Sequence, residues 1–261
     1  MKSLYWNPKS YIQNSSPQYL EGKKIIEYLG SERNKSILDI GCGTGHLTYE
    51  IALLSKTNAI TGIDSSKEMI TYAKQHYSYP NLNFLEMNAQ HMNFLPKKFD
   101  FIVSNFCLHW VEDKLSAFTG IKDHLKFDGK VFLVIPLHNK KMTYVREYLL
   151  KNSKWNKYFS NYINPHVFVQ DDNYKNYIIK ADLQNVNYNI ETGKTIFGNF
   201  DKFKSFLKNV NPCLGKLSNE QDRDDFINDF IKLYILEEPL DSNNNYVMTY
   251  SYVKIQNLCL P

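Results

Sequence analysis

The stretch from residue 36 to residue 46, SILDIGCGTGH, constrains the fold of this chain more than any other segment. An apolar strand, interrupted by Asp39, leads directly into an expected helix. Between the two lie three glycines in five positions, Gly41, Gly43 and Gly45. Because glycine has no Cβ, such a loop turns tightly and lets a ligand approach the bare backbone. The segment therefore predicts a ligand-binding turn at the carboxyl end of a strand.

Segments with strand-like and helix-like patterns alternate along the first 136 residues. The expected strands cover residues 36–40, 59–64, 82–87, 99–105 and 129–136. One expected helix precedes the first strand, and others fill the intervals at about 45–54, 66–77 and 113–125. Strands separated by helices form βαβ units, which build a parallel sheet with helices on both faces. We therefore predict an α/β fold with a doubly wound sheet.

The pattern changes after Pro136. Residues 138–185 are rich in aromatic side chains and are expected to form an inserted helical lid that shapes an acceptor pocket. Alternation returns with an expected strand at 185–197, helices at 200–210 and 220–236, and a final strand at about 244–260. We expect one domain over residues 1–261, with residues 1–30 as a helical cap over the site.

Composition and charge limit the functions open to this chain. Its 261 residues are 43% hydrophobic and 22% charged, which allows a packed core. The net charge of +4 is small and the lysines are scattered, so a nucleic-acid partner is not expected. The four cysteines are too far apart to predict a zinc site or a disulfide framework, and no metal site is expected.

The N-terminal segment MKSLYWNPKSY lacks the apolar core of a signal peptide. No later run is long and apolar enough to span a bilayer. We therefore expect a cytoplasmic protein with no membrane span. Nothing in the sequence indicates an oligomeric state.

Three ligand classes use a glycine-rich turn between a strand and a helix. A phosphate-binding P-loop requires a lysine followed by Ser or Thr, whereas His46 and Leu47 follow here. The dinucleotide fingerprint spaces its glycines as G-x-G-x-x-G, whereas the third glycine here comes one position early. The second strand ends in Asp64, whose carboxylate can accept hydrogen bonds from both hydroxyls of a ribose. A nucleoside is therefore the expected ligand.

Four motifs occur in order along the chain: LDIGCGTGHLT, GIDSSKEMI, MNAQHMNF and FDFIVSNFCLHWVED. Together they resemble the motifs of the class I S-adenosylmethionine-dependent methyltransferases, over the first 135 residues. The resemblance implies S-adenosyl-L-methionine as the cofactor and S-adenosyl-L-homocysteine as the product. It also implies a Rossmann-like fold, with a mostly parallel, doubly wound seven-stranded sheet, an antiparallel last strand and a helical lid insertion.

The functional positions of that family can be carried over to the matching residues of this chain. By this resemblance, the glycine loop lies along the methionine moiety, the acid after the second strand binds the ribose, and later motifs reach the adenine. The implied cofactor-binding residues are Asp39, Gly41, Cys42, Gly43, Gly45, Asp64, Ser65, Met69, Asn88, Ala89, Asn105 and Phe106. Met69 would lie on the adenine, and Cys42 is interpreted as a small loop residue, not a nucleophile. Because the family usually has aspartate at the position of Asn88, we expect weaker cofactor binding.

A second resemblance covers nearly the whole chain. The segments WNPKSYIQNSSPQ and HWVED look most like the group containing trans-aconitate methyltransferase, the malonyl-carrier methyltransferase of biotin synthesis and juvenile hormone acid methyltransferase. Because members of that group mostly methylate carboxylates, the resemblance implies O-methylation of a small or carrier-bound organic acid. A carboxylate is ionised at neutral pH, so no general base is required.

The same resemblance implies two hydrogen-bond donors that face the acceptor carboxylate, the amide of Gln18 and the indole of Trp110. Tyr11 would close over the methionine end of the cofactor. His109 would act as a base only if the acceptor were a hydroxyl or an amine, and is otherwise structural. The alternative interpretations are a core or rim aromatic for Trp110 and a solvated helix residue for Gln18.

Other functions stay open at this point. They are a nicotinamide-dependent oxidoreductase, a non-catalytic cofactor-binding protein, and a methyltransferase acting on a hydroxyl, an amine or a macromolecule. No N-P-P-[YF] base-flipping motif follows the fourth strand, which disfavours a nucleic-acid substrate. Five aromatic residues of the inserted segment are expected to form an apolar wall or else a small separate core: Tyr144, Trp155, Tyr158, Tyr162 and Phe168.

Overall fold

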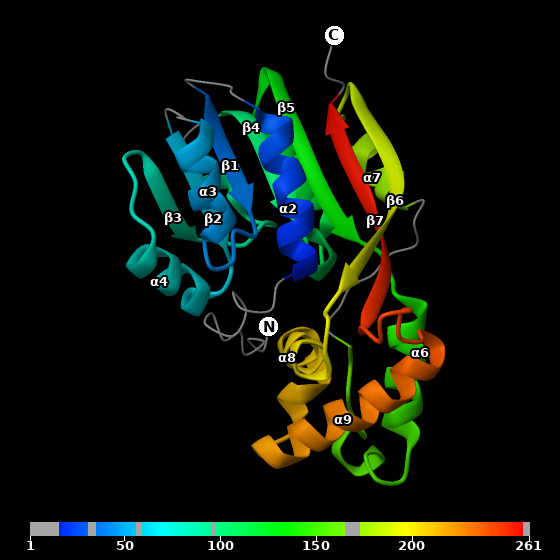
Figure 1. The fold of residues 1–261 in the computed structure, drawn as a ribbon. Helices are drawn as coiled ribbons and strands as arrows, with labels where there is room; N and C mark the ends of the chain where they lie inside the picture. The colour runs from blue at the N-terminus through cyan, green and yellow to red at the C-terminus, as the bar shows by residue number, and fades with distance from the viewer. Residues whose placement is uncertain (1–15, 31–34, 56–58, 95–97, 165–172, 258–261) are drawn as a thin grey trace.

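The computed structural model describes residues 16–30, 35–55, 59–94, 98–164 and 173–257. Within these residues, one sheet contains seven strands in the order β3-β2-β1-β4-β5-β7-β6 (Figure 1). The strands are β1 (Ser36–Ile40), β2 (Ala59–Asp64), β3 (Leu82–Glu86), β4 (Phe99–Asn105), β5 (Leu125–Pro136), β6 (Val186–Ile196) and β7 (Val247–Asn257). The first five strands pair in parallel, and β7 runs antiparallel to both β5 and β6. The predicted mostly parallel sheet with an antiparallel last strand is confirmed.

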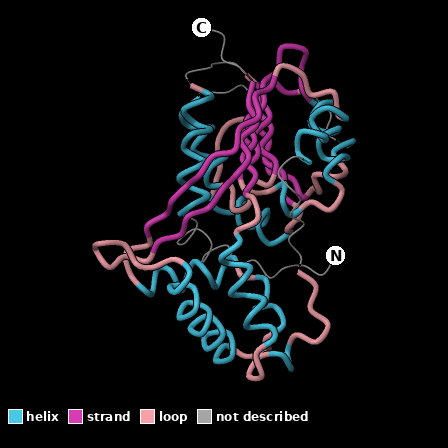
Figure 2. The backbone as a smooth tube through the Cα atoms, turned by 90° about the vertical axis from the view of Figure 1, so that its right-hand side faces the viewer, coloured by secondary structure: helices cyan, strands magenta, loops and turns pink. Residues whose placement is uncertain are grey.

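Helices cover both faces of the sheet, as Figure 2 shows. They are α2 (Ser16–Leu29), α3 (His46–Ser55), α4 (Lys67–His76), α5 (Lys114–His124), α6 (Lys140–Lys151), α7 (Asn173–Lys180), α8 (Phe200–Val210) and α9 (Glu220–Glu237). Successive residues of a strand point to opposite faces. Ile37 of β1 therefore joins the core beneath α2 and α3, whereas Leu38 joins the core beneath α5 and α7. Among the described residues, no helix has the length and apolar composition needed to cross a membrane.

The boundary between α5 and β5 differs from the prediction. The helix was expected over 113–125 and the strand over 129–136, but α5 ends at His124 and β5 already begins at Leu125. Leu125 pairs with Phe99 of β4, and the register then shifts so that Lys130 pairs with Phe101. Residues 126–129, with the sequence KFDG, lie at this shift, which explains why they look like a turn in the sequence.

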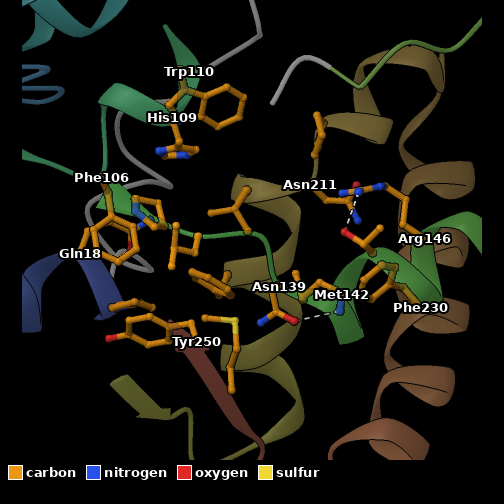
Figure 3. Close-up of a pocket in the computed structure, with 18 residues that line it drawn as sticks. Gln18, Phe106, His109, Trp110, Asn139, Met142, Arg146, Asn211, Phe230 and Tyr250 are labelled. Carbon is orange, nitrogen blue, oxygen red and sulfur yellow. Dashed lines mark hydrogen bonds between the residues drawn. The ribbon is translucent and has the colours of Figure 1, made fainter. Parts of the chain in front are cut away.

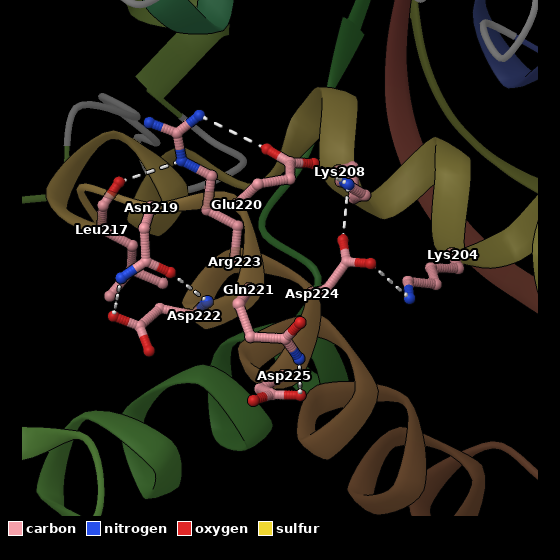
Figure 4. Close-up of polar contacts among 10 residues, drawn as sticks. All are labelled: Lys204, Lys208, Leu217, Asn219, Glu220, Gln221, Asp222, Arg223, Asp224 and Asp225. Carbon is pink, nitrogen blue, oxygen red and sulfur yellow. Dashed lines mark hydrogen bonds and ion pairs between the residues drawn. The ribbon is translucent and has the colours of Figure 1, made fainter.

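Three helices, α6, α8 and α9, gather beyond the carboxyl ends of the parallel strands (Figures 1 and 2). We refer to them as the outer helices. Helix α9 packs against both α6 and α8. Figure 4 shows the ion pairs that join α8 to α9: Lys204 pairs with Asp224, and Lys208 pairs with both Asp224 and Glu220. The packing of α9 on α6 and α8, together with these ion pairs, holds the outer helices together beyond the carboxyl ends of the strands.

The segment 138–185 contributes to two different layers. Its α6 belongs to the outer helices, whereas its α7 packs against α5 on one face of the sheet. Trp155 lies between these helices in sequence, is 2% exposed, and stacks edge to face on Phe226 of α9. Tyr158 contacts Trp155 and Tyr162 contacts Phe159, and these aromatic rings belong to the same large hydrophobic cluster as α9 and one face of the sheet, not to a separate core. Tyr144 is exposed, and Phe168 lies outside the described residues.

Gly45 is predicted to be important for stability. Its φ angle is +81°, and an added Cβ would lie 2.7 Å from the Phe84 ring and 2.8 Å from the Ala73 Cβ. Gly45→Ala should lower the free energy of unfolding by about 3 kcal/mol in urea denaturation, because it combines overpacking with an unfavourable backbone conformation. Gly215→Ala is the control, since a Cβ at Gly215 would meet nothing within 4 Å. Equal stability of the two variants would contradict this packing.

Candidate active site

The loop between β1 and α3 lies across the end of β2. The backbone N–H groups of Gly41 and Cys42 both donate to the Ile63 carbonyl, at 2.8 and 3.0 Å. Gly43 has a φ angle of +53°, and a Cβ built on it would meet no atom of the described residues within 4 Å. The middle of the loop therefore faces open space, where a ligand can lie against bare backbone.

Two cysteines border this loop, the buried Cys42 and the partly buried Cys107. A Cβ on Gly41 would lie 2.3 Å from the Sγ of Cys107, so Cys107 covers one side of the loop. Burial, reinforced by the charges of Asp39 and Asp64, raises the pKa of the Cys42 thiol well above its usual value. Burial and the same two charges also raise the pKa of Cys107. Both thiols stay protonated at neutral pH, which agrees with Cys42 as a loop residue and not a nucleophile.

The Asp64 carboxylate joins the loop to the turn after β2. Its Oδ2 accepts a hydrogen bond from the Gly43 N–H at 3.0 Å, and its Oδ1 accepts one from the Ser66 N–H at 2.8 Å. Burial raises the pKa of Asp64 above its usual value, although these hydrogen bonds act in the opposite direction. An ionised carboxylate offers about four lone-pair sites, so about two stay available for further donors. Ser65, between Asp64 and Ser66, is exposed.

Asp39 lies beneath the loop, with 2% of its surface exposed. The Thr48 hydroxyl of α3 donates to its Oδ2 at 2.7 Å. Burial raises the pKa of Asp39 to about 6, opposed by the Thr48 hydrogen bond and supported by the nearby charge of Asp64. Two carboxyl groups therefore lie close together at the ends of β1 and β2, and a cationic ligand would favour their ionised forms.

The residues assigned to the adenine lie near the start of α4 and the end of β3. Met69 is 3% exposed, and its N–H donates to the hydroxyl of Ser66, which caps α4, at 3.2 Å. The Oδ1 of Asn88 accepts from the Gln90 N–H at 3.0 Å, and Ala89 is buried. One lone pair of the Asn88 carbonyl is thus in use, which leaves one for an adenine amine.

Asn105 is the last residue of β4, and Phe106 comes directly after it. Both residues lie on the other side of the loop. The Nδ2 of Asn105 donates to the Gln18 carbonyl of α2 at 2.7 Å. The Oδ1 of the same side chain is buried and has no hydrogen-bond partner among the described residues. Phe106 has a φ angle of +52°, which is rare for a residue with a side chain. A buried acceptor without a donor is unfavourable, so the Asn105 Oδ1 fits a ligand that brings an N–H group.

A pocket opens between this edge of the sheet and the outer helices (Figure 3). Polar side chains lie on two sides of it, with Gln18, His109 and Trp110 on one and Arg146 and Asn211 on the other. Much of the remaining lining is apolar and includes Phe106, Leu137, Met142, Phe206, Phe230 and Met248. Among the described residues, no Asp or Glu side chain lines the pocket.

The three residues predicted to face an acceptor all line this pocket. The Oε1 of Gln18 is buried and has no hydrogen-bond partner in the described part of the chain. Half a turn of this amide would present its N–H₂ donor at the same point. His109 and Trp110 come from the short helix η2 (Leu108–Trp110), with His109 6% exposed and the two rings 5.0 Å apart. Tyr11 lies outside the described residues.

Arg146 lines the pocket although no sequence motif marks it. Its side chain comes from α6 and is 9% exposed. Its Nη2 donates to the Thr143 Oγ1 at 2.9 Å. The one feature of the sequence that could have drawn attention to Arg146 is the scarcity of arginine, since only three of the 31 basic residues are arginines.

Comparison with known proteins identifies the family. Residues 31–186 match the family described as a methyltransferase domain. The chain is also 32% identical, over 229 residues, to a protein of Invertebrate iridescent virus 6 that is named as a methyltransferase. That alignment covers 88% of this chain and 85% of the viral protein. The chain belongs to the class I S-adenosylmethionine-dependent methyltransferases.

Two further similarities place this methyltransferase among its relatives. It is 25% identical over 265 residues to juvenile hormone acid O-methyltransferase of Drosophila melanogaster, covering 96% of this chain and 89% of the relative. A solved structure of Haemonchus contortus phosphoethanolamine N-methyltransferase 2 with S-adenosyl-L-methionine superimposes with a TM-score of 0.55 at 16% identity. That similarity covers 93% of this chain and 53% of the Haemonchus chain, and it shows a shared fold.

The buried Asp39 gives this methyltransferase a testable pH dependence. The pKa of Asp39 is about 6 in the folded protein, above the usual value of 3.8. Its stabilising contribution is therefore complete below about pH 4 and is lost as the pH rises through about 6. The Asp39→Asn variant does not show this loss of stability, because an amide does not ionise. Its side-chain oxygen can still accept the hydrogen bond from Thr48. From about pH 5 to about pH 8, the variant should gain about 1.5 kcal/mol in free energy of unfolding relative to the wild type.

Urea denaturation of both proteins at several pH values measures this difference. A difference that stays constant over the whole range would show that the pKa of Asp39 is not raised.

Proposed function

We propose that this methyltransferase transfers a methyl group from S-adenosyl-L-methionine to a carboxylate oxygen of a small or carrier-bound organic acid. The observation that carries the proposal is the charge of the pocket. An arginine lines it, and no acidic side chain of the described residues does. Such a lining favours an anionic acceptor over a cationic amine. The Drosophila relative, whose name describes an acid O-methyltransferase, supports the same choice.

The residues at the carboxyl ends of β1, β2 and β4 fit this cofactor. Asp64 would accept hydrogen bonds from the ribose hydroxyls through the lone pairs that Gly43 and Ser66 leave available. The buried Oδ1 of Asn105 would accept a hydrogen bond from the ammonium group of the methionine moiety. The open space over Gly43 would let the cofactor lie against the backbone.

When bound, S-adenosyl-L-methionine supplies an electrophilic methyl group on a positively charged sulfur, and its transfer to a carboxylate oxygen releases S-adenosyl-L-homocysteine without moving a proton. The amide of Gln18 and the indole N–H of Trp110 would orient the acceptor carboxylate. The apolar part of the lining would exclude water from the reacting atoms. Because a carboxylic acid with a pKa of about 4 is already ionised, His109 is not needed as a base.

Methyl transfer to acceptors that share a carbon skeleton tests the proposal. A carboxylic acid, the corresponding primary alcohol and the corresponding amine are each offered with S-adenosyl-L-methionine, over a panel of skeletons. The proposal predicts methylation of acids and little or no methylation of alcohols and amines. Methylation of the amine or the alcohol, with the acid inert, would contradict it.

In the same assay, Trp110→Phe should raise the KM for the acid or lower kcat, because it removes the indole donor. Trp155→Phe is the matched control, since the Trp155 indole donates to Asp229 within the outer helices. An acid KM and kcat that are the same in Trp110→Phe and the wild type would remove Trp110 from the acceptor site.

Asp64→Asn should weaken the binding of S-adenosyl-L-homocysteine by about tenfold, because the hydrogen bonds to the ribose lose their charge assistance. Isothermal titration calorimetry measures this change. Glu86→Gln is the control, since Glu86 pairs in register with Asp64 at the end of β3 and its side chain is exposed. An Asp64→Asn variant with the affinity of the control would exclude Asp64 from the ribose site.

A further inference from the structure

Arg146 brings a largely buried positive charge into the pocket. It lies one helical turn after Thr143 on α6, and 9% of its surface is exposed. Its hydrogen bond to Thr143 uses one of the five N–H donors of a guanidinium. In the described part of the chain, no Asp or Glu forms an ion pair with Arg146. With respect to the residues that the structure describes, most of its donors are therefore available to a ligand.

Two side chains near Arg146 that could ionise, Cys213 and Tyr162, supply no negative charge. Burial raises the pKa of the Cys213 thiol to about 11, although the nearby Tyr162 hydroxyl and the charge of Arg146 act in the opposite direction. Burial and the neighbouring Cys213 raise the pKa of Tyr162 as well, although the charge of Arg146 opposes this. Both groups are neutral at neutral pH. A buried cation without a counter-ion is unfavourable, so a ligand that brings an anion to Arg146 would be stabilised there.

Asn211 adds a second polar group on the same side of the pocket (Figure 3). It is 8% exposed, and its Oδ1 accepts a hydrogen bond from the Cys213 N–H at 3.1 Å. This bond fixes the amide and leaves its N–H₂ donors on the other side of the group. A planar guanidinium binds a carboxylate through two parallel hydrogen bonds, and an amide donor beside it can add a third.

This polar side lies opposite the side that we propose for the reacting carboxylate. Figure 3 shows Gln18, His109 and Trp110 across the pocket from Arg146 and Asn211. The rest of the lining is mostly apolar and includes Met142, Phe206 and Phe230, with Asn139, Thr143 and Tyr250 as its further polar members. An acceptor that matches this lining has an anionic group at each end of an apolar chain.

We propose that the acceptor carries a second anionic group, in its simplest form a second carboxylate, which Arg146 and Asn211 bind while the first carboxylate is methylated. The acceptor class is then a dicarboxylic acid, and the product is its monomethyl ester. The inference rests on the proposed function, because it specifies the acceptor of the same site. It makes Arg146 a specificity-determining residue that selects a dianion over a monoanion.

The test compares straight-chain dicarboxylic acids with monocarboxylic acids of the same chain lengths as methyl acceptors. For the wild type, we expect kcat/KM to be at least about tenfold higher for the best dicarboxylic acid than for its monocarboxylic counterpart. Arg146→Met keeps a long apolar side chain but removes the charge, so it should bring this ratio close to one, mainly through KM. Arg146→Lys keeps the charge without the planar fork and should give an intermediate ratio.

Lys151→Met is the matched control, since Lys151 is an exposed basic residue on the same helix. It should keep the substrate ratio of the wild type. A thermal-shift assay without cofactor gives an independent measure of binding. The best dicarboxylic acid should raise the Tm of the wild type and of Lys151→Met, and should leave that of Arg146→Met unchanged. Titration with S-adenosyl-L-homocysteine establishes that each variant is folded.

The possible outcomes distinguish this inference from the proposed function. Equal kcat/KM for both acids, unaffected by Arg146→Met, would overturn the second anionic group and leave carboxylate methylation standing. Transfer to alcohols or amines, with every acid inert, would overturn both. If Arg146→Met does not fold, Arg146→Lys decides alone, because a ratio equal to that of the wild type would overturn the inference.

Discussion

The hydrogen bonds of the Asp64 carboxylate organise the edge of the sheet on which the site depends. They join the Gly43 N–H of the loop after β1 to the Ser66 N–H of the turn after β2. Because β1 and β2 are parallel neighbours, their carboxyl ends meet, and one carboxylate can fix both connections. The loop is thereby held with open space over Gly43 and with the Asn105 acceptor on its other side. A loop held in this way would favour the affinity for the nucleoside that we propose, because it is already organised before binding.

The charges of the site are divided between its two halves. Asp39 and Asp64 lie on the side proposed for the cofactor, at the ends of β1 and β2, whereas Arg146 lies on the side proposed for the acceptor and comes from the outer helices. A cationic methyl donor and an anionic acceptor would each lie near charges of the opposite sign. The sheet therefore supplies the part that suits the cofactor, and the outer helices supply the part that suits a particular acceptor.

The meeting of Gly43, Asp64 and Asn105 at one edge of the sheet could be predicted from the sequence, because these residues belong to short contiguous motifs. The strands at 36–40 and 59–64 have the expected bounds, since each is a mostly apolar run with a clear end. The first is followed by Gly41, and the second ends in Asp64. The start of β5 at Leu125 could not be predicted, because it depends on pairing with Phe99 of another strand. Arg146 was missed for a similar reason: its burial follows from the packing of α6 on α9, which lies far away in the sequence. The proposed role of Tyr11 stays a prediction.

Calorimetric titration of the wild-type protein with S-adenosyl-L-homocysteine, and in parallel with NADH, tests most directly whether the edge formed by Gly43, Asp64 and Asn105 binds a methyltransferase cofactor. We expect saturable binding of S-adenosyl-L-homocysteine at one site per chain and no binding of NADH. Binding of NADH without binding of S-adenosyl-L-homocysteine would contradict this expectation, and would assign the glycine loop to a dinucleotide.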